Sequence, residues 1–92
     1  MLVLPAELTH AQAGPCSRML AQALRAEPGP QAVADASALR HFDSSALAVL
    51  LDCRREALAL GKTFAVRGLP HRLRELAGLY GVAELLPAPP EA

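Results

Sequence analysis

Aromatic residues are scarce in this 92-residue chain, which has two Phe, one Tyr and no Trp. A core must therefore be built from Leu, Val and Ala, which are plentiful because 52% of the residues are hydrophobic. An excess of either charge is also lacking, since nine Lys and Arg balance nine Asp and Glu. Proteins that bind nucleic acid normally carry a clustered basic excess, so this balance argues against a nucleic-acid partner.

Long apolar runs are missing as well. The longest, Ala46 to Leu51, is far shorter than the ~20 residues that cross a bilayer. No basic region precedes an apolar core at the N-terminus, so no signal peptide is predicted. These two absences predict a cytoplasmic protein with no segment inserted directly into a membrane.

The chain also lacks the spacings that mark metal and cofactor sites. Cys16 and Cys53 fit neither a zinc motif nor a Cys-x-x-Cys pair, and we expect both thiols to be buried in helices. The three histidines have no ligand spacing, and no glycine-rich phosphate loop occurs. We therefore predict no metal, no cofactor and no catalytic residue, so the chain is not expected to be an enzyme.

Apolar periodicity and turn residues predict an alternation of strands and helices. The expected strands are 1–4, 62–67 and 32–36. The strand at 32–36 is inferred from its place after a Pro-Gly turn and before a helix, because its periodicity alone does not indicate one. The expected helices are 16–26, with Pro15 in the first turn, 44–60, ending before Gly61, and 70–80, with Pro70 first. Leu69, Leu73, Leu76, Ala77 and Tyr80 form the apolar stripe of the last helix. A short apolar segment, 82–86, and a proline-rich, disordered tail, 87–92, close the chain.

The central helix has the clearest start and the widest apolar face. Asp43, Ser44 and Ser45 are all favourable N-cap residues. Behind them, Val49, Cys53 and Leu60 extend the apolar positions well beyond the face that covers a sheet. A chain this short has little material with which to bury a helix on two sides. We therefore expect the additional apolar face to be exposed and to contact a partner.

Three segments, in order, resemble the STAS domain family. Phe42 to Leu51 resembles its Asp-Ser/Thr-Ser/Gly-Gly-Leu turn opening an amphipathic helix, with Ala46 where Gly is usual. Lys62 to Leu69 and Leu76 to Val82 resemble its next strand and its closing helix. The resemblance implies an α/β, STAS-like domain over residues 1–86, a small mixed β-sheet with helices packed mainly on one face. STAS domains usually begin with two strands, so the first edge strand is missing or lies upstream.

The ending, with Leu79 and Tyr80, most resembles the MlaB-type subunit of a phospholipid ABC transporter that maintains outer-membrane lipid asymmetry. That resemblance implies a non-enzymatic protein, held at the inner face of the inner membrane through a transporter complex, with the ATPase subunit as its partner. The hydroxyl residue after the motif aspartate, here Ser44, makes the contact in those transporters. The expected partner-binding residues are Asp43, Ser44, Ser45, Leu47 and Val49.

A second branch of the family gives the alternative. In anti-sigma factor antagonists an anti-sigma factor kinase phosphorylates the second hydroxyl residue of the motif, which corresponds to Ser45 here. A phosphoryl group at that position adds ~1.5–2 negative charges beside Asp43 and is expected to expel a bound partner. The motif alone leaves both alternatives open.

Overall fold

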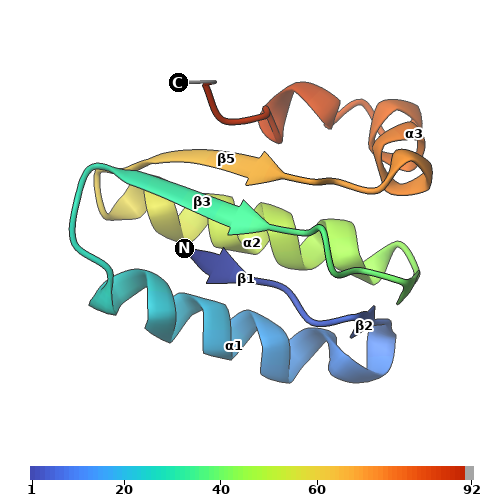
Figure 1. Cartoon of the computed structure of the whole chain (residues 1–92), viewed down its shortest axis with the longest axis horizontal. Helices are drawn as coiled ribbons and strands as arrows, with labels where there is room; N and C mark the ends of the chain where they lie inside the picture. Colours follow the sequence, from blue (N-terminus) through green and yellow to red (C-terminus); the bar gives the residue numbers. More distant parts are fainter. Residues whose placement is uncertain (91–92) are drawn as a thin grey trace.

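The computed structural model describes residues 1–90 and shows an α/β fold, which confirms the predicted class (Figure 1). The main sheet has the strand order β1–β3–β5, with β1 at Leu2–Val3, β3 at Gln31–Asp35 and β5 at Thr63–Arg67. A smaller sheet pairs β2, Glu7–Leu8, with β4, His41–Phe42. The three main strands agree with the prediction to within one residue at each end, whereas β2 and β4 were not predicted.

Two long helices run side by side along the sheet, and a short one lies apart from them (Figure 1). The two long helices are α1, His10–Ala26, and α2, Ser45–Ala59, and the short one is α3, His71–Leu79. A single 3-10 turn, η1 at Ala83–Leu85, packs next to α3. Across the described residues, none of these helices has the length and apolar character that a bilayer crossing needs.

A mixed sheet was predicted, but each of the three strand pairings found within residues 1–90 is parallel. The physical reason lies in the connections, because α1 and α2 each carry the chain from the end of one main strand back to the start of the next. All main strands therefore end on the same side of the molecule. The first turns of α1, α2 and α3 lie on that side too (Figure 1).

Alternation along the strands gives the main sheet one buried face and one partly exposed face. Leu2, Ala34 and Val66 occupy neighbouring strands in register and are all buried. On the other face Val3 is exposed. The helices α1 and α2 cover the buried face, as expected from the prediction of helices mainly on one side. Leucine supplies most of the largest fully buried side chains: Leu2, Leu4, Leu8, Leu20, Leu24, Leu50, Leu73, Leu86 and Val66.

Helix α1 begins at His10, well before the predicted start at Cys16. The local cause is a polar cap, in which Gln12 Oε1 accepts hydrogen bonds from the Thr9 N–H at 2.8 Å and from the Thr9 hydroxyl at 2.7 Å. Pro15 therefore lies inside the helix and not in its first turn. Proline has no backbone N–H, so at this position it cannot donate the hydrogen bond to the preceding turn. Pro15 is exposed, so water can solvate the backbone carbonyl of the preceding turn that is left without a donor.

The two ends of the main sheet differ. Leu4 donates its N–H to the Asp35 carbonyl at 2.9 Å, so the N-terminal segment pairs with β3 and forms the outer edge. At the opposite edge the Val66 N–H donates to the Pro87 carbonyl at 2.8 Å. The tail predicted to be disordered from Pro87 therefore starts with one fixed residue, and residues 91–92 lie outside the described part.

The C-terminal end of α3 departs from the predicted apolar stripe. Leu73 and Ala77 are buried as expected, but Tyr80 is 60% exposed and Leu79 is 82% exposed. The helix ends at Leu79, and Gly81, with a φ of 72°, turns the chain away immediately afterwards. Tyr80 is therefore a C-cap residue and is not part of the buried stripe.

The turn at Gly68 provides a test of the packing between β5 and the β3–β4 connection. Gly68 has a φ of 69°, and a Cβ atom added to it would lie 2.7 Å from Ser37 Cβ. Gly61 has a similar φ, 76°, with no atom within 4 Å of the corresponding position. We expect Gly61→Ala to lower the free energy of unfolding by about 1–2 kcal/mol through the backbone conformation alone. Gly68→Ala is expected to cost about 2–4 kcal/mol because the clash adds to it. Urea denaturation measures both, and equal losses would contradict the close packing.

Candidate functional site

Asp43 connects the beginnings of two helices. Its Oδ1 atom accepts the N–H of Ser45, the first residue of α2, at 2.8 Å. Its Oδ2 atom accepts the N–H of His10, the first residue of α1, at 3.1 Å. The backbone carbonyl of Asp43 also accepts the Ala46 N–H at 3.1 Å. One carboxylate thus fixes the relative positions of the first turns of α1 and α2.

The electrostatics of the turn follow from these bonds. The N–H of Ser45 is the largest cause that lowers the pKa of Asp43, and the His10 N–H and the Ser45 hydroxyl lower it further. Burial of the carboxyl group acts in the opposite direction but does not outweigh them. The carboxylate is therefore ionised near neutral pH, where a negative charge beside two helix N-termini is favourable.

The two serines of the turn have different surroundings. Ser44 is the N-cap residue and is exposed, and its side chain makes no capping hydrogen bond. Ser45 is half-buried and lies beside the Asp43 carboxylate. Asp43 therefore does the capping that was expected of all three residues, and the Ser44 hydroxyl is left facing solvent.

An arginine from α3 lies next to this turn. The Arg72 guanidinium carbon lies 5.8 Å from the centroid of the Phe42 ring, over its face. Phe42 ends β4 and immediately precedes Asp43, and its side chain is partly buried against the core. His10 and Arg72, which are far apart in the sequence, thus contact the neighbouring residues Asp43 and Phe42, respectively.

The apolar part of the predicted partner surface is buried inside the chain, which corrects the expectation. Leu47 and Val49 are each 2% exposed and Cys53 is 3% exposed, so none of them contacts an external partner here. Of the additional apolar face only Leu60 is open, at 45% exposure. The reason is α1, which packs along the side of α2 that the sheet does not cover. The chain therefore buries α2 on two sides, against the sheet and against α1, contrary to the expectation from its short length.

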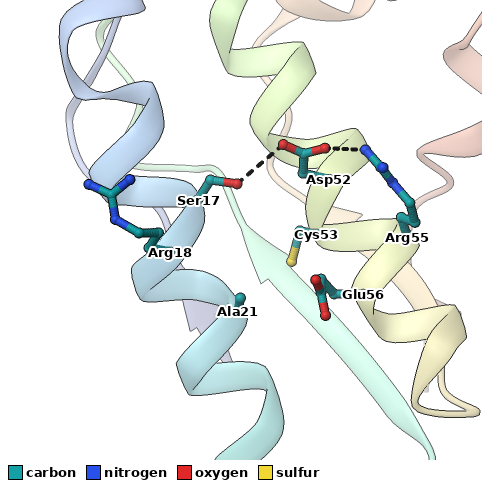
Figure 2. A pocket seen from close by; sticks show the side chains of 7 residues that line it. All are labelled: Ser17, Arg18, Ala21, Asp52, Cys53, Arg55 and Glu56. Carbon is teal, nitrogen blue, oxygen red and sulfur yellow. Dashed lines mark hydrogen bonds and ion pairs between the residues drawn. The ribbon is translucent and has the colours of Figure 1, made fainter.

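The same packing leaves a polar groove between α1 and α2 (Figure 2). Ser17 and Asp52 point toward each other across it, with 3.3 Å between Ser17 Oγ and Asp52 Oδ2, and Arg55 also pairs with Asp52. The lining residues are Ser17, Arg18, Ala21, Asp52, Cys53, Arg55 and Glu56. Burial raises the pKa of Cys53 to about 11, which makes its thiol a poor nucleophile. These polar groups mainly satisfy one another and tie the two helices together.

Nothing in residues 1–90 gathers three potential metal ligands of the Asp, Glu, His or Cys type in one place. The two carboxylate oxygens of Asp43 are occupied by backbone N–H groups of His10 and Ser45. The turn presents an exposed serine, Ser44, whose side chain makes no capping hydrogen bond.

Sequence reasoning located the turn but missed two of its components. The link to His10 joins residues 33 positions apart, which no local pattern reveals. The Thr9-x-x-Gln12 spacing, a variant of the capping box, would have indicated that α1 starts there. The position of Arg72 over Phe42 depends on how α3 packs and has no signal in the sequence.

Removing the charge of Asp43 tests its double role. In the unfolded chain this carboxyl group titrates at about 4, and in the native state its pKa is lower. The contribution of the Asp43 carboxylate to stability is therefore complete above the unfolded-state pKa of about 4, and it is lost as pH falls through the native pKa. We expect Asp43→Asn to be less stable than the wild type at pH 7, with a difference that shrinks below pH ~4.

Amide hydrogen exchange separates this role from a general loss of stability. Asp43→Ala should accelerate exchange at both the His10 and the Ser45 N–H, because each loses its acceptor. Asp35→Asn is the matched control, since Asp35 also has a lowered pKa but bonds only to Ser37. Faster exchange at only one of the two amides, or a stability difference independent of pH, would show that Asp43 does not join the helices.

Comparison with known families gives a match over nearly the whole chain. The family model described as "Mlab, STAS domain" matches residues 1–87. A comparison with curated proteins found no significant match. STAS domains are generally non-enzymatic binding domains, which agrees with a site made of a capped turn and an exposed hydroxyl. Because the match includes the strands, the three helices and the Asp43 turn, the chain belongs to the STAS domain family.

Proposed function

We propose that the chain is the non-enzymatic subunit of an ABC-type phospholipid transporter that maintains outer-membrane lipid asymmetry. In this role it binds and regulates the ATPase subunit at the inner face of the inner membrane. The description of the matching family, which names Mlab, supports this assignment. The observation that carries it is the exposed Ser44 hydroxyl, which no group within residues 1–90 engages.

The geometry of the turn favours docking by Ser44. A hydroxyl group both donates and accepts a hydrogen bond, so it can pair with backbone or side-chain groups of the ATPase. Since Asp43 already fixes the turn, little conformational freedom remains to be lost when a partner binds. The first N–H groups of α2 are also occupied, so the hydroxyl and the surface around it are what the partner meets.

The other expected binding residues take supporting roles in this proposal. Asp43 and Ser45 form the turn that presents Ser44. Leu47 and Val49 lie beneath it in the core and anchor the first turns of α2. Their contribution to binding is indirect, through the position of the helix end.

A pull-down from native cells tests the assignment. The wild-type chain should recover an ABC transporter ATPase subunit, and Ser44→Arg should not, because the long cation displaces the partner. Ala59→Arg is the matched control, since Ala59 is exposed at the opposite end of the same helix. Both substitutions are at exposed positions, so we expect each to change the free energy of unfolding by no more than about 0.5 kcal/mol.

The result has three clear readings. Recovery of the ATPase by the wild type and by Ala59→Arg, but not by Ser44→Arg, would support the proposed interface. Equal recovery by Ser44→Arg would exclude the Ser44 surface. Recovery of a kinase without an ATPase would exclude the transporter assignment and favour the alternative below.

The alternative is an anti-sigma factor antagonist switched at Ser45, and one observation favours it. Ser45 contributes its N–H, and in part its hydroxyl, to the Asp43 carboxylate. A phosphoryl group on this residue would place ~1.5–2 negative charges against that carboxylate. Repulsion would then weaken the bonds that hold the first turns of α1 and α2, so modification would alter the docking surface itself.

Intact-mass measurement decides on this alternative. Incubation with the cognate anti-sigma factor kinase and ATP should add the mass of one phosphoryl group to the wild type and to Ser44→Ala. It should add nothing to Ser45→Ala, since that variant lacks the acceptor hydroxyl. Absence of added mass on the wild type, or its persistence in Ser45→Ala, would rule out a switch at Ser45.

A further inference from the structure

Arg72 is an exposed cation that packs against Phe42, the residue before the Asp43 turn. It is the second residue of α3, and its side chain extends over the ring of Phe42, with 5.8 Å from Cζ to the centroid. Phe42 is separated from Ser44 only by Asp43. The guanidinium group therefore lies over a residue only two positions before Ser44 in the chain.

Within residues 1–90 this guanidinium group has no carboxylate partner. The ion pairs of the structure join other groups: Met1 with Glu27, Arg25 with Glu56, Arg55 with Asp52, and His71 with Glu75. Asp43 is close in sequence to Phe42, but its two oxygens accept backbone N–H groups. An arginine held over an aromatic ring keeps N–H donors available for a planar acceptor.

We propose that Arg72 is a partner-binding residue that pairs with a carboxylate on the protein docked at Ser44. This inference rests on the proposed function, because it specifies the chemistry of the same interface. The ATPase subunit would present an acidic side chain that accepts hydrogen bonds from the guanidinium group while Ser44 bonds nearby. Arginine is among the residues that most often dominate the binding energy of such interfaces.

The surroundings of Arg72 favour a protein carboxylate over an anionic membrane surface. Binding to anionic lipids draws on a cluster of basic residues, each adding a modest increment. Here Arg72 lies over the ring of Phe42, and the whole chain has no net charge. A single guanidinium group oriented by an aromatic ring suits one specific carboxylate.

The test uses the complete chain and the purified ATPase subunit recovered with it. Arg72→Ala should weaken binding about tenfold or more, Arg72→Lys less, and Arg72→Glu more than Arg72→Ala because it adds repulsion. The dissociation constant of Arg72→Ala should also depend less on salt than that of the wild type, since one ion pair is missing. Phe42→Leu should weaken binding less than Arg72→Ala, because it leaves the charge but removes its support.

Arg74→Ala is the matched control, since Arg74 is an exposed arginine of the same helix that does not lie over Phe42. It should bind like the wild type with an unchanged salt dependence. Urea midpoints for all variants establish that any loss of binding is not a loss of folding.

The outcomes separate this inference from the proposed function. If Ser44→Arg abolishes binding but Arg72→Ala binds like the wild type, the carboxylate contact is wrong and the interface stands. If Arg72→Ala binds weakly with an unchanged salt dependence, Arg72 only supports Phe42 and the inference is overturned. If the wild type does not bind the ATPase at all, both fail. If it binds vesicles of anionic phospholipid and Arg72→Ala does not, the ligand is a lipid headgroup and the carboxylate is excluded.

Discussion

The arrangement of the site depends on one carboxylate that accepts hydrogen bonds from two helices. In a layout where α1 and α2 run in the same direction, their unsatisfied first N–H groups lie at the same end of the molecule. Asp43 satisfies one from each, and its charge suits both helix dipoles. Because Asp43 caps the helix, the N-cap residue Ser44 does not need to, and its hydroxyl remains exposed. The exposed hydroxyl of the site is thus a consequence of how the two helices are joined.

The packing of α1 on α2 limits where a partner can bind. With Val49 and Cys53 buried, the large exposed apolar side chains of α2 and its C-cap are Leu58 and Leu60, near the C-terminal end. A partner of the Ser44 turn would therefore recognise the other end of the helix, where Ser44 is exposed and Arg72 lies over Phe42. Such a small, largely polar surface gives specificity through hydrogen bonds and charge, with less help from buried apolar area.

Periodicity and turn residues were enough to predict α2, β5 and most of α3, because each adjoins a glycine or proline and has a regular apolar pattern. The strand β3 was predicted from its place between a Pro-Gly turn and the next helix, since its own apolar pattern is irregular. The start of α1 was wrong because Pro15 was weighted above the weaker signal of Thr9 and Gln12. The strands β2 and β4 have two residues each, too few for a pattern. For the site, the Asp43 turn was predictable from residue types. The burial of its apolar neighbours was not, since it depends on the packing of α1.

The two adjacent serines would serve the two proposed functions in different ways. A partner that binds the Ser44 hydroxyl leaves every bond of Asp43 in place, so docking and release need no change in the fold. A phosphoryl group on Ser45 would compete directly with Asp43 for the first N–H groups of α2, and it would loosen α1 through the same carboxylate. Use of the first serine therefore makes the turn a stable docking point, whereas use of the second makes it a switch. Because Asp43 binds α1 as well as α2, such a switch would act on both helices at once.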